Sequence, residues 1–224
     1  MENYNVEVLF VIDASGSMCK LADDTIGGFN GFIDRQKRMD GKAKVTTTLF
    51  NGKSTILYSG VDISEVEKLI EETYQTGGMT ALLDAVGETI STAQDRIDET
   101  PAEERMDKVI VVIITDGLEN ASRKYTRDQI KKMVEHQTKG HGWEFVFLGA
   151  NIDSFAESSG IGVTKSMDFA FTNEGLTTAY AAVDCAVNSL RSTGSVSAEW
   201  TNADALSNII ETHESITSLS CDGK

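Results

Sequence analysis

The chain has 224 residues, of which 40% are hydrophobic and 25% are charged, and it contains a single proline, Pro101. This composition is that of a globular protein and excludes wholesale disorder, and the length fits one domain of roughly 200 residues better than two. A formal net charge of −15, with no basic cluster to offset it, argues against nucleic acid or an anionic membrane surface as a partner.

The sequence shows no signal peptide and no membrane-spanning segment. Residues 1–5 are polar and acidic, and the longest aliphatic run, Val109–Ile114, is too short to cross a bilayer. Cys19, Cys185 and Cys221 are far apart and form no C-x-x-C pair, which predicts reduced thiols rather than a zinc site or a disulfide framework. We therefore expect a soluble cytoplasmic protein.

The first half of the chain predicts alternating strands and helices. Residues 6–12 are nearly all apolar, as in a strand buried on both faces of a parallel sheet. In residues 44–50, Val45, Thr47 and Leu49 fall on one face, which predicts a strand. Asn51-Gly52 then predicts a two-residue hairpin turn with positive φ angles, and residues 55–58 should return as an antiparallel edge strand. Apolar residues at helical spacing predict three helices: Phe29, Phe32 and Ile33 in the first; Val66, Leu69 and Ile70 in the second; Leu82, Val86, Ile90 and Ile97 in the third. The second should begin at Ser64, because Ser64 and Glu67 have the spacing of a capping box.

The second half continues this alternation. Residues 109–114 and 145–148 read as central strands, and 167–171 as the last strand. Thr126 and Gln129 predict a second capping box at the start of a fourth helix, and a short helix is expected over 154–159. The apolar residues of the long helices are Ile130, Met133 and Val134 in the fourth, and Leu176, Tyr180, Val183, Val187 and Leu190 in the last.

Together these elements predict an α/β fold. The expected architecture is a doubly wound, Rossmann-like, mostly parallel six-stranded sheet with one antiparallel edge strand and helices on both faces. Residues 1–194 would form this one domain, and the polar residues 195–224 would form a C-terminal tail with one short helix at most. In such sheets ligands bind at the carboxyl ends of the strands, near the switch in strand order, here the loops after Ile12, Thr76 and Thr115.

Five oxygen-bearing side chains lie in these three loops. The first strand runs directly into Asp13-Ala14-Ser15-Gly16-Ser17, and the central strand into Thr115-Asp116-Gly117. Between them, the glycine-rich stretch Gly77-Gly78-Met79-Thr80 can bring a hydroxyl close to the other two segments. Two carboxylates and three hydroxyls, without His or Cys, suit a hard cation that keeps some water, which points to Mg²⁺ or Mn²⁺.

The Asp-x-Ser-x-Ser motif, the loop threonine and the Thr-Asp-Gly motif resemble the metal-ion-dependent adhesion site of von Willebrand factor type A domains, including intracellular bacterial and phage members. The resemblance covers roughly residues 4–190, and each motif position holds the expected residue type, namely Asp13, Ser15, Ser17, Thr80 and Asp116. It implies that Ser15 and Ser17 bind the ion directly, that Thr80 and Asp116 exchange between direct and water-mediated contact, and that Asp13 acts mainly through water and the serines. It also implies that an Asp or Glu of a partner protein completes the metal shell.

Three functions remain in competition at this point. The favoured one is a Mg²⁺-dependent protein-binding module that is not an enzyme. A metal-dependent phosphohydrolase with Asp13 as nucleophile is the second, but such enzymes carry another carboxylate two residues later, where this chain has Ser15. The third is a structural domain with a non-functional metal site. The sequence does not identify the partner or the oligomeric state.

Overall fold

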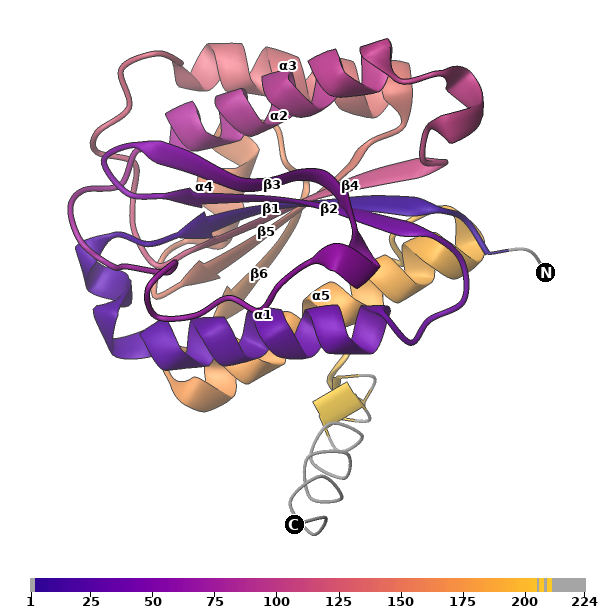
Figure 1. Cartoon of the computed structure of the whole chain (residues 1–224). Helices are drawn as coiled ribbons and strands as arrows, with labels where there is room; N and C mark the ends of the chain where they lie inside the picture. The colour runs from indigo at the N-terminus through magenta and orange to yellow at the C-terminus, as the bar shows by residue number, and fades with distance from the viewer. Residues whose placement is uncertain (1–2, 205, 208, 211–224) are drawn as a thin grey trace, which may run out of the picture.

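The computed structural model describes residues 3–204, 206–207 and 209–210, and it forms a three-layer α/β structure (Figure 1). Six strands make one sheet: β1 (Val6–Asp13), β2 (Ala43–Phe50), β3 (Ser54–Asp62), β4 (Lys108–Thr115), β5 (Glu144–Ala150) and β6 (Lys165–Phe169). Five α-helices flank it: α1 (Ala22–Gln36), α2 (Leu82–Glu99), α3 (Arg127–His141), α4 (Ser154–Gly160) and α5 (Asn173–Thr193). Three short 3₁₀ helices lie at Gly16–Leu21, Ile63–Glu65 and Ala102–Glu104.

The sheet confirms the predicted fold class. Its strand order is β3-β2-β1-β4-β5-β6, and every neighbouring pair is parallel except β2 with the edge strand β3. The strand order switches direction between β1 and β4, whose paired residues end at Ile12 and Ile114. The segments that follow these two strands therefore leave the sheet side by side, at the position where such sheets bind ligands.

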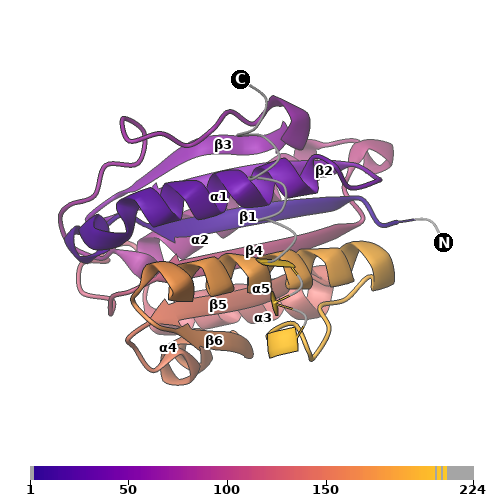
Figure 2. The ribbon, with the colours of Figure 1, turned by 90° about the horizontal axis from the view of Figure 1, so that it is seen from below.

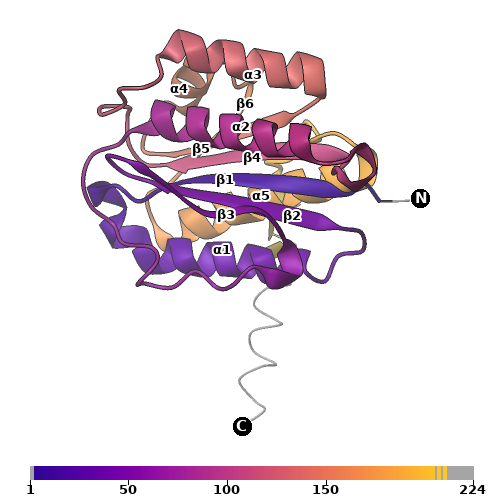
Figure 3. The same ribbon diagram turned by 45° about the horizontal axis from the view of Figure 1, so that its top comes forward.

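Two separate cores explain why the central strands are apolar throughout. Phe10 and its alternate neighbours face α1 and α5, which lie side by side on one face of the sheet (Figure 2). The Phe10 ring packs edge-on against Phe29 and Phe32 of α1, with ring centroids 5.3 and 5.1 Å apart. Leu9 and Val11 face the other way, toward α2 and α3 (Figure 3). Both faces of β1 are thus buried, and for that reason its sequence does not alternate between apolar and polar residues.

The prediction that a helix begins at Ser64 is wrong. Only a single 3₁₀ turn forms at Ile63–Glu65, and residues 66–70 have no regular structure. Two side chains of α1 satisfy the backbone of this stretch: Asn30 both donates to and accepts from the backbone of Leu69, and Lys37 donates to the carbonyl of Val66 at 2.9 Å. Because these groups already have partners, the stretch can bury Val66 and Leu69 without becoming helical.

The hairpin between β2 and β3 is present, but its turn differs from the prediction. Neither Asn51 nor Gly52 has a positive φ angle. The turn is instead closed by Asn51, whose backbone N–H donates to the Lys53 carbonyl at 3.0 Å and whose side-chain oxygen accepts from the Lys53 N–H at 3.2 Å. The Asn side chain therefore replaces the backbone geometry expected of an Asn-Gly turn.

Other elements lie close to their predicted positions. The capping box of Thr126 and Gln129 is present at the start of α3, and α4 covers the expected 154–159. The last strand begins and ends two residues earlier than predicted, because the Thr172 hydroxyl caps α5 and the chain must leave the sheet before it. Among the described residues, no helix has the length and apolar character needed to cross a membrane.

The described start of the segment predicted as a polar tail packs on the core. Val196, Trp200 and Leu206 are buried in the cluster that includes α1 and α5. Residues 206, 207, 209 and 210 are helical, and they include the apolar residues Leu206, Ile209 and Ile210. Residues 211–224 of the predicted tail, including Cys221, lie outside the described residues. Cys19 and Cys185 are free thiols.

The close packing of α1 on α5 yields a stability prediction. A Cβ at Gly28 would lie 2.1 Å from the Tyr180 ring, whereas one at the neighbouring Gly27 would meet nothing within 4 Å. Gly28→Ala should therefore lower the free energy of unfolding by about 1–3 kcal/mol, while Gly27→Ala should raise it by about 0.5–1 kcal/mol through helix propensity. Chemical denaturation of both variants tests this; equal stabilities would contradict the packing of α1 on α5.

Candidate metal centre

Asp13 lies at the carboxyl end of β1 and is completely buried. Its carboxylate accepts hydrogen bonds from the Thr115 hydroxyl at 2.6 Å and from the Ser15 backbone N–H at 2.7 Å, which hold it between β1 and β4. Burial raises the pKa of Asp13 to about 6, against the opposing effect of these hydrogen bonds, and the negative charge of Asp116 adds to the rise. This carboxylate is held in place in an environment that disfavours its charge.

Ser15, Ser17 and Asp116 form a connected chain of oxygens. The two serine hydroxyls are 3.1 Å apart, and the Ser17 hydroxyl donates to the Asp116 carboxylate at 2.7 Å. Burial raises the pKa of Asp116 as well, although the hydrogen bond from Ser17 opposes it. Asp13 and Asp116 therefore form a pair of partly desolvated carboxylates with two hydroxyls beside them.

Thr80 is brought to the same place by a loop that is hydrogen bonded on both sides. Gly77 donates to the Ala14 carbonyl at 2.8 Å and Gly16 to the Gly78 carbonyl at 3.2 Å, so this loop is joined to the serine loop. A Cβ at Gly117 would lie 3.2 Å from the Thr80 hydroxyl and 3.8 Å from an Asp13 carboxylate oxygen. The Thr80 hydroxyl and the Asp13 carboxylate thus both lie next to Gly117. The five predicted residues therefore lie in one region, on three loops that hydrogen bonds or Gly117 connect.

Three polar side chains that the sequence interpretation left outside the site hold its loops. The Asn120 side chain accepts from the Thr80 N–H at 2.9 Å, and the Asn120 N–H donates back to the Thr80 carbonyl at 3.0 Å. The Glu119 carboxylate accepts from the backbone N–H groups of Leu83, Ala121 and Ser122. Tyr74 donates its hydroxyl to the Asp13 carbonyl. Tyr74, Asn120 and the Glu119 contact to Leu83 each join residues that are 36 or more positions apart, so the sequence gives no signal of these contacts; only the Glu119 contacts to Ala121 and Ser122 are local.

Asp84 lies in the first turn of α2, where a carboxylate is commonly a solvated surface group, but here it has a structural role. It accepts hydrogen bonds from the backbone N–H groups of Arg123, Lys124 and Tyr125 at 2.8, 2.8 and 2.9 Å. Burial alone would raise its pKa, but these three donors outweigh burial and lower it. Asp84 therefore anchors the loop that follows Asp116 to helix α2.

Removal of the Asp84 carboxylate should destabilise this loop strongly. We expect Asp84→Ala to lower the free energy of unfolding by about 2–4 kcal/mol, because three backbone donors lose a charged acceptor. Asp95→Ala, an exposed carboxylate on the same helix, should change it by less than about 0.5 kcal/mol. Because the Asp84 pKa is lowered by folding, its contribution is present at neutral pH and is lost as the pH falls through the lowered pKa. Denaturation of both variants at pH 7 measures the difference, and similar losses would exclude this anchoring role.

The donor set fits a hard divalent cation. All five side chains offer oxygen, and no group of three or more His, Cys, Asp or Glu that could hold a metal occurs in the described part of the chain. A site here would therefore need the hydroxyls as well as the two carboxylates. A cation bound here would stabilise the ionised form of Asp13, against the burial that raises its pKa and the smaller effect of the Asp116 charge.

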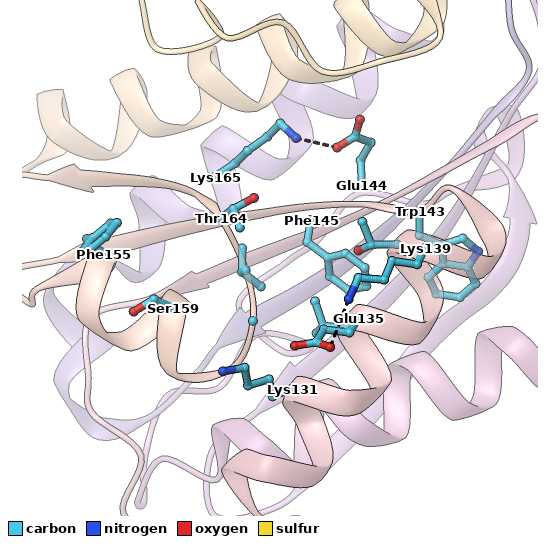
Figure 4. A pocket seen from close by; sticks show the side chains of 14 residues that line it. Lys131, Glu135, Lys139, Trp143, Glu144, Phe145, Phe155, Ser159, Thr164 and Lys165 are labelled. Carbon is cyan, nitrogen blue, oxygen red and sulfur yellow. Dashed lines mark hydrogen bonds and ion pairs between the residues drawn. The ribbon is translucent and has the colours of Figure 1, made fainter.

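A hollow of about 480 Å³ lies between α3, α4 and β6 (Figure 4). Its lining includes Trp143 and Phe145, and four of its charged side chains form two ion pairs, Lys165 with Glu144 at 2.8 Å and Lys139 with Glu135 at 3.4 Å. None of the five candidate metal residues lines it. This hollow is thus separate from the polar cluster.

Comparison with known proteins agrees with this fold. A sequence model of the family described as von Willebrand factor type A domain matches residues 7–198. A comparison with curated proteins gives no match.

Solved structures with this fold are distant in sequence. Proximal thread matrix protein 1 of the mussel byssus, solved with a zinc-occupied MIDAS motif (metal-ion-dependent adhesion site), aligns at 17% identity and a TM-score of 0.56 over 81% of this chain and 45% of its own. A von Willebrand factor type A protein of Catenulispora acidiphila gives 13% and 0.57 over 82% and 42%. The ArnB paralogue VWA2 of Sulfolobus acidocaldarius gives 17% and 0.52 over 79% and 44%. The chain spans less than half the length of these proteins, and at such identities the likeness shows the fold alone.

Proposed function

Because the chain belongs to the von Willebrand factor type A domain family, we propose that it is a protein-binding module that uses Mg²⁺ to dock an acidic group of a partner protein. The ion would be held by Asp13, Ser15, Ser17, Thr80 and Asp116. One observation carries this proposal: the Ser15 and Ser17 hydroxyls and the Asp116 carboxylate form a continuous chain of oxygens beside Asp13. Such a cluster needs no further side chain to offer a cation an all-oxygen shell.

The mixture of ligands explains why a partner carboxylate would bind. Three of the five side chains are neutral hydroxyls, so they do not cancel the charge of a dication to which they bind. A metal held in this way stays electrophilic at any open position, and a carboxylate is the ligand that a hard cation prefers there. The protein itself carries a net charge of −15 and would otherwise repel an acidic partner, which makes the metal the local source of attraction.

Mg²⁺ is preferred to zinc on the basis of the donor atoms. Zinc sites in proteins usually include His or Cys, and this cluster has neither. The mussel protein was solved with zinc at its MIDAS motif, which shows that a related site can take that ion. We expect Mg²⁺ and Mn²⁺ to compete with each other at this site under physiological conditions. Isothermal calorimetry with each ion, followed by a crystal soaked in Mn²⁺, tests the metal and its position. An anomalous peak away from Ser15 and Ser17 would contradict the proposal.

The partner is sought by its dependence on the metal. The full chain, immobilised and exposed to an extract of its native host, should retain a protein in Mg²⁺ that chelator releases, and mass spectrometry identifies that protein. A Ser15→Ala and Asp116→Ala double variant on the same support removes background. A protein that binds both supports equally is not a ligand of this site. A cytoplasmic location, where Cys19 and Cys185 stay reduced, belongs to the same proposal, and fractionation of the host tests it.

The geometry favours binding over hydrolysis. The Ser15 and Ser17 hydroxyls are hydrogen bonded to each other and to Asp116, and their described partners include no His, the usual base of a serine hydrolase. Burial and its two hydrogen bonds hold Asp13 in place between strands, and Ser15 stands where aspartyl phosphatases carry their second carboxylate. The chain is thus proposed not to be an enzyme.

Absence of turnover is a separate prediction. Aryl phosphate and ester substrates incubated with the Mg²⁺-loaded protein should show no hydrolysis above a no-protein control. Metal-dependent turnover that disappears in Asp13→Asn would instead establish the phosphohydrolase alternative. Turnover that persists in that variant would point to a contaminating enzyme.

A further inference from the structure

Two large apolar side chains in the loops of the proposed metal site are more than half exposed. Met79 and Leu118 are each 54% exposed. Met79 directly precedes Thr80, and Leu118 follows Asp116 and Gly117. A single exposed leucine carries little information, because much of any protein surface is apolar. Here, however, both exposed side chains adjoin the residues proposed to hold the metal.

Hydrogen bonds prevent the Met79 loop from turning its side chain inward. On one side the loop is joined to the serine loop, through Gly77 to Ala14 and Gly16 to Gly78. On the other side the backbone of Thr80 exchanges two hydrogen bonds with Asn120. Burial of Met79 in the core would break these contacts and move Thr80 as well. The methionine is therefore held at the surface by the same bonds that position a proposed metal ligand.

Leu118 is held outward in a similar way. Before it, the Gly117 N–H donates to the Thr115 hydroxyl at 3.1 Å. After it, the Glu119 carboxylate fixes the chain by accepting from the backbone of Leu83 and Ser122. Because Thr80 and Asn120 are hydrogen bonded to each other, Met79 and Leu118 lie on neighbouring loops. We call these two side chains the apolar rim. Because hydrogen bonds already hold their loops, the backbone of the rim would lose little conformational entropy when the rim is covered.

We infer that Met79 and Leu118 determine partner specificity, by binding apolar side chains that flank the carboxylate docked at the metal. The inference rests on the proposed function. It assigns the partner a recognisable chemistry: an Asp or Glu with a large aliphatic or aromatic residue within about two positions, because an extended residue advances by about 3.3 Å and only near neighbours can reach this rim. Water released from both apolar surfaces would favour the complex, which the metal contact would orient.

A second flank of the site, which is acidic, would suit a different partner. A hollow of about 580 Å³ extends from Cys19 to Thr76, next to the serine loop and the Gly77 loop, and is lined by Asp23, Glu71 and Glu72, together with Lys20. If this acidic flank dominated recognition, the partner carboxylate would be accompanied by lysine or arginine instead of by an apolar residue. The two flanks therefore make opposite demands on the partner sequence, and one experiment separates them.

The test uses a displayed library of random 12-residue peptides as its probe. The library is bound to the full chain in Mg²⁺ and eluted with EDTA. We expect the eluted peptides to carry an Asp or Glu with a large apolar neighbour. Met79→Ser and Leu118→Ser should each weaken these peptides about tenfold, without a change of more than twofold in calorimetric Mg²⁺ affinity. Met39→Ser and Ile70→Ser, which alter apolar side chains that are 40% and 49% exposed elsewhere, are the matched controls and should change nothing.

The outcomes distinguish the two proposals. Metal-dependent peptides with basic or polar neighbours, or peptides that ignore both rim variants, would overturn the specificity inference and leave the proposed function standing. Equal losses in the rim and control variants would also overturn it. A library that yields no EDTA-eluted peptide contradicts the proposed function, and the specificity inference falls with it.

Discussion

The double variant Ser15→Ala and Asp116→Ala should lose Mg²⁺ binding, with an affinity at least about 100-fold weaker than that of the wild-type chain. Changes that only disturb the orientation of metal ligands commonly cost 10–100-fold, and this variant deletes two of the proposed ligands outright. The chain of oxygens from Ser15 through Ser17 to Asp116 would be interrupted at both ends. Calorimetry with MgCl₂ at constant ionic strength measures the loss.

The same variant separates a lost site from a lost fold. In chelator its thermal unfolding should resemble that of the wild type, because neither side chain packs in the apolar core. Loss of the Asp116 carboxylate also removes a negative charge that, in addition to burial, disfavours ionised Asp13. With Mg²⁺ at 100 times its dissociation constant, only the wild type should gain about 2.7 kcal/mol of stability. Ser91→Ala with Asp95→Ala on α2, an exchange of the same residue types far from the cluster, should behave as the wild type. Retained Mg²⁺ affinity in the Ser15 and Asp116 variant would place the ion elsewhere.

The sheet and the polar cluster could be predicted from the sequence because each depends on local pattern. β1, β4 and β5 are buried on both faces, and burial of that kind favours a nearly continuous apolar run. Within β1 the run is broken by the buried Glu7, which pairs with Arg96. Asp13, Ser15 and Ser17 lie within one turn of chain, so their spacing alone places them together. Parallel strands then bring Asp116 to the same edge. These are properties that survive any rearrangement of the surrounding helices.

The errors have the opposite origin, since they involve residues far apart in the chain. The stretch after Ser64 has helical periodicity and a capping-box spacing, yet Asn30, almost 40 residues earlier, occupies the backbone groups that a helix would have used. Asp84 is likewise defined by backbone donors at Arg123 to Tyr125, which no local pattern reveals. In the first case tertiary hydrogen bonds to backbone groups override helix propensity. In the second case they give a helical carboxylate a role that its position in the sequence does not indicate.

The C-terminal segment shows how composition can mislead. Residues after Ser192 are rich in Ser, Thr, Ala and Asn, so the segment reads as a solvated tail. Trp200 is nevertheless 5% exposed and packs into the same cluster as Leu190 of α5. A few large apolar side chains suffice to fix a polar segment against a core, because one buried aromatic removes as much apolar surface from water as several small residues.

Partner binding should disappear in EDTA, and this is the largest effect expected of the intact protein. The protein carries a net charge of −15, while screening at physiological salt limits that field to roughly 8 Å, so attraction at the docking point has to come from the ion. Substitution of the docked partner carboxylate by its amide should cost about as much affinity as removal of the metal, because both changes delete the same contact. Thr80→Ala should weaken binding more modestly and leave the fold intact, whereas Thr138→Ala, an exposed threonine on α3, should have no effect. The decisive measurement is the affinity of the captured partner with and without Mg²⁺ at fixed ionic strength. Equal affinities in the two buffers would show that the partner binds another surface of the domain.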